Sequence, residues 1–294
     1  MYSLLMFLAL FVLIFLGFPV AFSLISVAFA FGLITFGDAV IFQFISKIEG
    51  ISTNFILAAV PLFVFMGSML ERSGIAQQLF SAIHMWTRKL PGGLSIGTVI
   101  MCIIFAASTG VIGATETVVG LLAIPAMLKH NYSHSLISGT ICAGGSLGTI
   151  IPPSVVVVVL GPIADVSIGD LMVGMLIPGL ILALLYIIYI FLLCLVKPEN
   201  GPRINTDDEI SRLTLNQKLV ITVKALIPPL LMIFAVLGSI MLGWAAPTEA
   251  AALGAAGSIL LSIFYKKLNW QTFKEALIKT ITVTSMIMFI LMAG

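Results

Sequence analysis

The chain has 294 residues, of which 60% are hydrophobic and only 9% are charged, and its mean hydropathy is +1.21. Soluble domains carry about 25% charged residues, so this composition excludes a soluble protein and predicts an all-α polytopic membrane protein in a lipid bilayer. The formal net charge of +2, with no basic stretch that alternates with aromatic residues, gives no indication of nucleic acid as a partner.

Long runs of apolar residues predict where the membrane helices lie. In chain order the apolar segments are 3–17, 19–36, 54–71, 94–109, 111–128, 135–160, 171–196, 219–242, 247–265 and 277–294. Several are shorter than the ~20 residues that a full span needs. The amphipathic stretches 75–90 and 268–281 are expected to form helices that lie in the membrane interface.

The short segments 94–109 and 111–128 are joined by a small polar sequence, 108–115, with almost no linker. Two short apolar helices joined inside the hydrophobic layer make a re-entrant hairpin. Two short spans with a tight turn between them are the alternative.

The stretch Ala-Gly-Gly-Ser-Leu-Gly-Thr-Ile-Ile-Pro-Pro-Ser (143–154) lies inside a long apolar run. Its three glycines are expected to loosen a helix, its two prolines remove N–H donors, and the proline after Ile151 pushes that residue out of the α region. Backbone groups freed at membrane depth persist only where protein or a water-filled cavity satisfies them. A discontinuous helix here predicts a place where something polar binds.

Basic residues predict the orientation in the membrane. Every Lys and Arg except Lys47 lies in or beside the segments 72–93, 129–134, 197–218 and 266–279. The positive-inside rule makes this side cytoplasmic. The polar segment 197–218, which contains the acidic run 207–209, is the one clear linker.

The hairpin tip and the break supply small side chains, hydroxyls and backbone groups rather than charges. The candidate ion- and substrate-binding residues are Ser108, Thr109, Gly110, Gly113, Thr115, Gly144, Gly145, Ser146, Gly148, Thr149, Pro152, Pro153 and Ser154. Carbonyl and hydroxyl oxygens suit Na⁺, and the N-termini of half-helices equally suit an anion. Close helix packing in lipid is the alternative for small residues, and we favour it for Gly32, Gly120, Gly139 and Gly254.

Three carboxylates at membrane depth need an explanation. Glu116 follows the hairpin tip, where it could take a proton, pair with a cation or cap the following half-helix. Asp170 completes a predicted capping box with Ser167. Glu249 fits the first turn of a helix opened by Pro247.

No sequence feature indicates an enzyme or a bound cofactor. The sequence contains no nucleophile–base pair, H-E-x-x-H motif, P-loop or nucleotide fingerprint. An ATP-driven pump would need a soluble nucleotide domain, so any energy must come from an ion gradient or from another subunit. The histidines His84, His130 and His134 do not have the spacing of a zinc site. The three cysteines are expected to be small buried hydrophobic residues.

Eight short motifs follow one another along the chain. They are Gly-Phe-Pro-Val-Ala-Phe (17–22), Val-Pro-Leu-Phe-Val-Phe-Met-Gly (60–67), Leu-Pro-Gly-Gly-Leu (90–94), Ile-Pro-Ala-Met (124–127), Gly-Ser-Leu-Gly-Thr-Ile-Ile-Pro-Pro-Ser (145–154), Val-Ser-Ile-Gly-Asp-Leu (166–171), Ile-Pro-Gly (177–179) and Ala-Pro-Thr-Glu-Ala-Ala-Ala (246–252). This ordered set resembles the large membrane (permease, DctM-like) subunit of tripartite ATP-independent periplasmic (TRAP) transporters.

The resemblance implies a Na⁺-coupled, elevator-type importer of an organic acid with an inverted-repeat fold. It implies a small membrane subunit and a periplasmic substrate-binding protein as partners, and a place in the cytoplasmic (inner) membrane of a bacterium or archaeon. Na⁺ would bind at the hairpin tip and the broken helix as the coupling ion, with no other cofactor. The family's tip commonly has a Ser-Gly-Ser-Ser-like sequence followed by Ala-Thr, whereas the tip of this chain is longer and is followed by Glu116.

The resemblance also predicts a division of the chain. The expected parts are scaffold helices and an interfacial arm (1–93), a transport-domain hairpin and broken helix (94–170), a connecting helix (171–196), a cytoplasmic linker (197–218) and an incomplete second repeat (219–294). The second hairpin and break would lie beyond Gly294, which predicts a truncated chain, a fragment or one piece of a split subunit. The alternatives are a carrier for Na⁺ and carboxylates, or Na⁺ and H⁺, that needs no binding protein, a non-transporting assembly piece, and an intramembrane enzyme.

Overall fold

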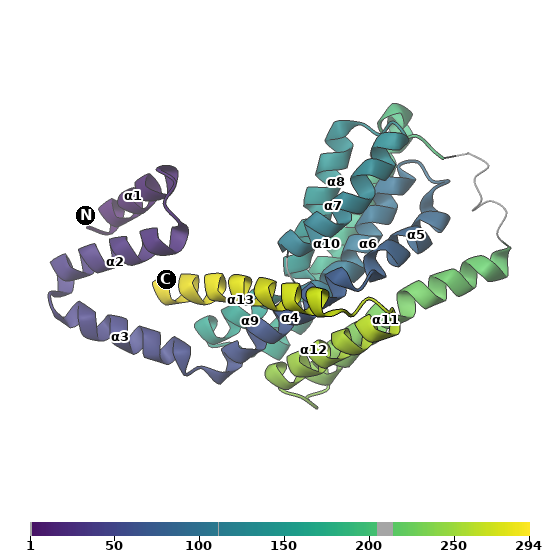
Figure 1. Ribbon diagram of the computed structural model, residues 1–294. Coiled ribbons are helices and arrows are strands. Elements are labelled where there is room, and N and C mark those ends of the chain that lie inside the picture. The colour runs from purple at the N-terminus through teal and green to yellow at the C-terminus, as the bar shows by residue number, and fades with distance from the viewer. Residues whose placement is uncertain (1, 111, 205–213) are drawn as a thin grey trace. The chain divides into compact units, whose positions relative to one another are not determined.

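The computed structural model describes residues 2–110, 112–204 and 214–294, and these residues form helices joined by turns, with no strand (Figure 1). The α-helices are α1 (Tyr2–Phe15), α2 (Val20–Phe36), α3 (Ala39–Ser52), α4 (Ala59–Arg72), α5 (Ile75–Thr87), α6 (Gly93–Thr109), α7 (Ile112–Lys129), α8 (His134–Ile150), α9 (Val155–Ala164), α10 (Ile168–Val196), α11 (Leu215–Met241), α12 (Pro247–Phe264) and α13 (Trp270–Ala293). Two short 3₁₀ helices are η1 (Phe55–Ala58) and η2 (Pro198–Asn200). The prediction of an all-helical protein is confirmed.

Five helical segments of the described chain are long and apolar enough to cross a bilayer. They are Phe55–Arg72, Ile168–Val196, Leu215–Met241, Pro247–Phe264 and Trp270–Ala293. A sixth arises if α8 and α9, which meet at an angle of 44°, form one broken span. The chain is therefore an integral, multi-pass membrane protein.

The helices fall into two units, one formed by the residues up to Ala58 together with Ile281–Gly294, and the other by Ala59–Thr280. In the first unit, aromatic rings pack edge to face between Phe29 and Phe44, whose centroids are 5.8 Å apart, and between Phe22 and Phe289. The bare backbone of Gly32 lies against the side chain of Val40, which links α2 to α3.

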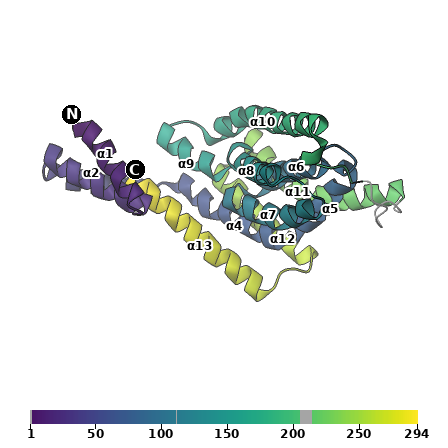
Figure 2. The same ribbon diagram turned by 90° about the horizontal axis from the view of Figure 1, so that it is seen from above.

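In the second unit, α6 is the central helix (Figure 2). It packs against α4, α5, α7, α8, α10 and α11, and most of its residues are buried. Even the hydroxyl-bearing residues Ser95 and Thr98 are fully buried. A helix that is apolar on all sides is expected in the centre of a bundle. The first arm of the predicted hairpin is therefore enclosed by protein.

The structure corrects two predicted elements. The helix α3 was not among the predicted apolar segments, because Gln43, Lys47 and Glu49 interrupt its apolar pattern. The predicted interfacial helix 268–281 is wrong as a separate element, since one helix runs from Trp270 to Ala293. No glycine or proline interrupts that helix, and a change from amphipathic to apolar composition does not by itself end a helix.

Close helix packing explains only some of the glycines for which it was preferred. Gly254 on α12 lies against the side chain of Met66 on α4, which confirms the prediction for that residue as it does for Gly32. A Cβ on Gly120 would make only ordinary contacts, and one on Gly139 would meet no atom within 4 Å. Packing therefore accounts for Gly32 and Gly254, and the prediction is wrong for Gly139.

Candidate functional site

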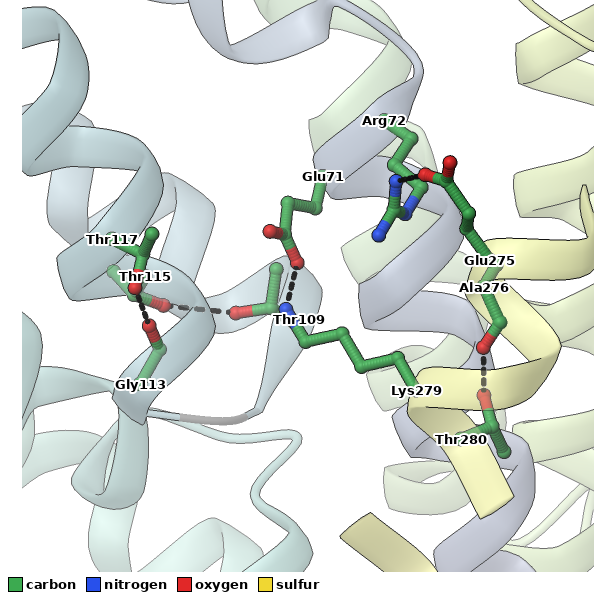
Figure 3. Close-up of polar contacts among 10 residues, drawn as sticks. All are labelled: Glu71, Arg72, Thr109, Gly113, Thr115, Thr117, Glu275, Ala276, Lys279 and Thr280. Carbon is green, nitrogen blue, oxygen red and sulfur yellow. Dashed lines mark hydrogen bonds and ion pairs between the residues drawn. The ribbon is translucent and has the colours of Figure 1, made fainter. Parts of the chain in front are cut away.

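The predicted hairpin is formed by α6 and α7, with only residues 110 and 111 between them. Gly110 has a φ of +64°, a left-handed conformation that glycine adopts without strain, and its N–H donates to the carbonyl of Ala106 at 2.9 Å. Beyond the turn, the fully buried hydroxyls of Thr109 and Thr115 are hydrogen-bonded at 3.0 Å (Figure 3). The tip is thus closed by a backbone cap and a threonine pair; residue 111 lies outside the described residues.

The predicted break lies between α8 and α9. Ile151 has an extended backbone (φ −83°, ψ 118°), as expected of a residue that precedes proline, and Ser154 is extended as well. The Pro152–Pro153 peptide bond is cis. The prediction of a discontinuous helix is confirmed, with the interruption confined to residues 151–154.

The glycines before the break do not interrupt the helix, and that part of the prediction is wrong. Gly144, Gly145 and Gly148 lie inside α8, which continues to Ile150. A Cβ on Gly144 would lie 2.5 Å from Sγ of Cys102 on α6, and one on Gly145 would lie 2.6 Å from a carboxylate oxygen of Glu116 on α7. The bare backbone lets both arms of the hairpin approach α8 closely, and this packing outweighs the cost of about 1 kcal/mol for each glycine in a helix.

The tip of the hairpin touches the break in the helix. A Cβ on Gly110 would lie 2.6 Å from the carbonyl oxygen of Pro153, and the N–H of Val155 donates to the carbonyl of Gly110 at 3.4 Å. The two segments in which every candidate site residue lies are therefore in direct contact.

The other hydroxyl groups of the candidate site residues fall into two kinds. Those of Ser108, Ser146 and Thr149 each donate to a backbone carbonyl of their own helix at 2.8 Å. The hydroxyl of Ser154 is fully buried and has no hydrogen-bond partner in the described part of the chain. A buried hydroxyl without a partner is costly, so Ser154 is the side chain best suited to a polar ligand.

Helix α4 backs the hairpin tip, which the sequence did not predict. A Cβ on Gly67 would lie 2.6 Å from the carbonyl oxygen of Thr109. The neighbouring Ser68 has a buried hydroxyl without a partner among the described residues. The available signal was the glycine inside the helical motif 60–67, where close approach of another backbone explains a residue that otherwise weakens a helix.

One turn beyond this contact, α4 is tied to α13 by two ion pairs (Figure 3). Lys279 pairs with Glu71, and Arg72 pairs with Glu275. Beside these pairs, the rings of Phe65 on α4 and Phe273 on α13 pack edge to face, with their centroids 5.9 Å apart. The first half of α13 is thus held to the helix that supports the tip.

The base of the hairpin is held by the connecting segments. The phenol of Tyr132 accepts from the N–H of Leu94 at 3.2 Å, and burial raises the pKa of Tyr132 to about 12. Gly92 donates to the carbonyl of Gly201 at 3.0 Å, and Ser133 donates to that of Asn200 at 3.0 Å. The start of the predicted linker is therefore bonded to both ends of the hairpin, whereas its acidic run 207–209 lies outside the described residues.

Of the two carboxylates with predicted structural roles, Glu249 is confirmed in its role, whereas for Asp170 only the Ser167 half of the predicted capping box is seen among the described residues. Glu249 accepts from the backbone N–H of Ala246 at 2.9 Å in the first turn of α12. Ser167 caps α10 by accepting from the N–H of Asp170 at 3.4 Å. Glu116 is half-buried and packs over the bare backbone of Gly145. Its predicted roles, in proton or cation binding or in capping, stay predictions.

Sequence comparison decides which family carries this hairpin and break. The family model described as Tripartite ATP-independent periplasmic transporter, DctM component, matches residues 7–294. The chain belongs to this family. The resemblance to TRAP large permeases is thus confirmed for nearly all residues of this chain.

Named relatives agree with the family. The C4-dicarboxylate TRAP transporter large permease protein DctM of Pseudomonas aeruginosa is 32% identical over 246 residues, which cover 83% of this chain and 56% of the relative. The sialic acid TRAP transporter large permease protein SiaM of Vibrio cholerae is 30% identical over 281 residues, covering 95% and 64%. The ectoine/5-hydroxyectoine TRAP transporter large permease protein UehC of Ruegeria pomeroyi is 30% identical over 191 residues, covering 63% and 44%. The chain spans about half the length of the curated relatives that it matches.

Proposed function

We propose that this chain is part of the large permease of a Na⁺-coupled TRAP transporter that imports an organic acid. A periplasmic binding protein would deliver the substrate and a small membrane subunit would accompany the permease, in the cytoplasmic (inner) membrane of a bacterium or archaeon. The observation that carries the proposal is the contact between Gly110 at the hairpin tip and Pro153 in the break. Transporter sites typically form where a discontinuous helix exposes backbone groups near another such element.

The oxygen atoms at this contact support Na⁺ as the coupling ion. Unwound backbone carbonyls and hydroxyls are the groups that hold Na⁺ in transporters of this kind. Ser154 offers a buried hydroxyl without a partner in the described chain, and Pro153 offers a carbonyl at the same place. Both are uncharged, so a bound cation would keep its full attraction for a carboxylate.

The anionic substrate is supported by the start of α9. Helix N-termini present unpaired N–H groups and the positive end of the helix dipole, which favour a carboxylate. C4-dicarboxylates and sialic acid, the compounds for which two of the relatives are named, carry carboxylate groups, and organic acids are therefore the substrate class we propose. Movement of 94–170 as an elevator against a scaffold remains part of this proposal.

Uptake into proteoliposomes tests the proposal. The full-length permease, its small subunit and its binding protein are reconstituted, and accumulation of labelled succinate, sialic acid and ectoine is measured under an inward Na⁺ gradient and under a matched K⁺ gradient. We expect Na⁺-dependent uptake of at least one probe. We expect Ser154→Ala to raise the Na⁺ concentration for half-maximal uptake by about ten-fold, because the lost contact between the hydroxyl oxygen and Na⁺ should be comparable in free energy to a hydrogen bond to a charged group.

A matched control is available on the same broken helix. Ser138 is an exposed serine of α8 whose hydroxyl bonds only to its own helix at 3.2 Å, so Ser138→Ala should leave the Na⁺ dependence unchanged. Uptake that proceeds without the binding protein would favour a self-sufficient carrier. Uptake that is equal in Na⁺ and K⁺ would contradict Na⁺ coupling.

A further inference from the structure

An apolar groove of about 450 Å³ lies between α11 and α12, which run side by side (Figure 1). Its walls are Ile227, Pro228, Leu231, Met232 and Ala235 on α11, Gly257, Leu260, Leu261 and Phe264 on α12, and Tyr265 directly after α12. Nine of these ten residues have no polar side-chain group. The volume falls within the roughly 300–1,000 Å³ of small-molecule sites, and the lining suits a hydrocarbon chain.

One end of the groove is polar. Pro228 has no N–H, so it cannot bond to the carbonyl of Lys224, four residues earlier on α11. The hydroxyl of Tyr265 donates to that carbonyl instead, at 3.4 Å. Burial raises the pKa of Tyr265, which keeps the hydroxyl protonated. The freed carbonyl and the phenol thus mark one mouth of an otherwise apolar groove.

Two lysines carry positive charge to this mouth. Lys224 lies one turn before Pro228, on the face of α11 that lines the groove at positions 228, 231 and 235. Lys266 directly follows Tyr265 where α12 ends. Both are exposed and neither is in an ion pair within the described residues, whereas the side chain of Lys267 extends toward Gly74.

The dimensions match one leaflet of a membrane. From Tyr265 to Gly257 the groove follows α12 for eight residues, or about 12 Å at 1.5 Å per residue. Half of the hydrocarbon core of a bilayer is about 15 Å. The lysines lie on the side that the positive-inside rule makes cytoplasmic, so the groove enters the membrane from the level of the headgroups on that side.

We propose that this groove binds an anionic phospholipid, with one acyl chain between α11 and α12 and the phosphate at Lys224, Lys266 and the Tyr265 hydroxyl. Basic side chains between membrane helices select anionic headgroups, and each contributes about five-fold to binding. A zwitterionic lipid would fill the groove equally well but would gain less from the two lysines. The proposal is independent of the substrate and of Na⁺ coupling.

A second groove provides an internal comparison. It has a volume of about 420 Å³ and lies between α8 and α10, where Gly139, Thr140, Tyr186 and Tyr189 are among its lining residues. It lies between other helices than the first groove, so a lipid bound in it does not contact Lys224 or Lys266. Filling it should therefore leave the preference that these two lysines give for a negative headgroup unchanged.

Native mass spectrometry of the full-length permease tests the lipid site. The protein is delipidated in detergent, mixed with phosphatidylglycerol or phosphatidylcholine of identical chains, and the lipid retained per molecule is counted. We expect preferential retention of phosphatidylglycerol, weakened by about five-fold for each of Lys224→Gln and Lys266→Gln. Ala235→Phe, which fills the groove from an exposed position, should reduce retention of both lipids.

Matched variants separate this site from general charge and from lipid at other surfaces. Lys129→Gln with Lys274→Gln removes two exposed lysines from the same predicted side, and Gly139→Phe fills the second groove. Neither should abolish the preference for phosphatidylglycerol. Equal retention of the two lipids, equal losses in the control variants, or a photo-crosslinker at Leu260 that captures a protein instead of phospholipid in native membranes would each overturn the proposal.

Discussion

Gly110 and Pro153 join the hairpin and the broken helix through their backbones. Because a Cβ on Gly110 would lie 2.6 Å from the Pro153 carbonyl oxygen, only glycine fits between them, and the φ of +64° at Gly110 disfavours any other residue independently. The contact thus depends on the absence of a side chain at residue 110. It also sets the carbonyl of Pro153 at the tip, where the proposed ion would bind.

Gly110→Ala should therefore destabilise the permease by about 2 kcal/mol, through the left-handed backbone and the displaced carbonyl. Thermal unfolding in detergent measures this, in NaCl and in choline chloride at equal ionic strength. Any stabilisation by Na⁺ should be lost together with the contact. Gly113→Ala is the matched control for stability, since a Cβ there meets no atom within 4 Å and alanine favours a helix. Equal stability of the two variants would contradict the argument.

Replacing both prolines of the break by alanine should let α8 and α9 join. Pro152→Ala with Pro153→Ala restores two N–H donors and removes the steric restriction on Ile151, so the backbone groups of the break can bond within a helix. We expect membrane insertion to persist and Na⁺-dependent uptake to fall by at least about ten-fold. Pro178→Ala, in the interior of the long helix α10, is the control. Uptake that is normal in the double variant would argue strongly against a site at the break.

The sequence predicted those parts of the site that depend on local chemistry. The glycine at the tip and the two prolines of the break act on the backbone next to them, so their effect needs no knowledge of the fold. The contact between Gly110 and Pro153 joins residues far apart in the chain and could be anticipated only from the family resemblance. The glycines of α8 misled because a glycine that loosens an isolated helix can equally let a neighbouring helix approach.

Tertiary partners explain what the sequence did not predict. Gly67 is one glycine within an apolar helix, and nothing in its neighbours indicates that Thr109 will lie against it. The stretch 268–281 indicated an amphipathic helix, and only the structure shows that its residues Glu275 and Lys279 have partners on α4. Local sequence patterns thus predicted the hairpin tip and the break, whereas the position of α4 against the tip is a result of tertiary packing that only the structure shows.

Gly67→Ala should test whether α4 supports the tip. The added methyl group would lie 2.6 Å from the backbone carbonyl oxygen of Thr109, which cannot rotate away as a side chain can. Overpacking of this kind costs about 1–3 kcal/mol, and we expect a matching fall in the free energy of unfolding. Gly238→Ala inside α11 meets no atom within 4 Å and should be neutral or stabilising. If Gly67→Ala is equally neutral, α4 does not constrain the tip.

His84 should make the permease sensitive to acid. It lies on α5, outside the candidate spans, and its ring packs on that of Phe80 with the centroids 4.2 Å apart. Burial, together with the charge of His130, lowers the pKa of His84 from 6.5 to about 4. Between these values the unfolded chain binds the proton and the folded chain does not, so stability is complete above pH 6.5 and declines as the pH falls toward 4.

The loss should amount to about 3 kcal/mol between pH 7 and pH 4. Unfolding by denaturant at a series of pH values measures it. His84→Leu should remove most of this decline, whereas His134→Gln, at the exposed start of α8, should retain it. An unchanged pH profile in His84→Leu would show that other groups cause the acid sensitivity.

The ion pair between Glu71 and Lys279 should couple α4 energetically to α13. The two side chains are 13% and 31% exposed, so the pair is better shielded from water than a surface ion pair. In a double-mutant cycle with Glu71→Gln and Lys279→Gln, we expect a coupling energy of about 1 kcal/mol in the free energy of unfolding. Neutral changes are preferable to exchanging the two charged residues, because Lys279→Glu would place a second carboxylate four residues from Glu275 on α13.

The same cycle with Lys274→Gln in place of Lys279→Gln is the control, because Lys274 is exposed and is in no ion pair among the described residues. Its two changes should add within about 0.3–0.5 kcal/mol. If the pair with Lys279 is equally additive, the ion pairs do not hold α13, and the packing of Phe273 on Phe65 would have to do so alone. If the coupling is present, the helix that touches Thr109 is fixed from both sides, by the hairpin tip at Gly67 and by α13 one turn later.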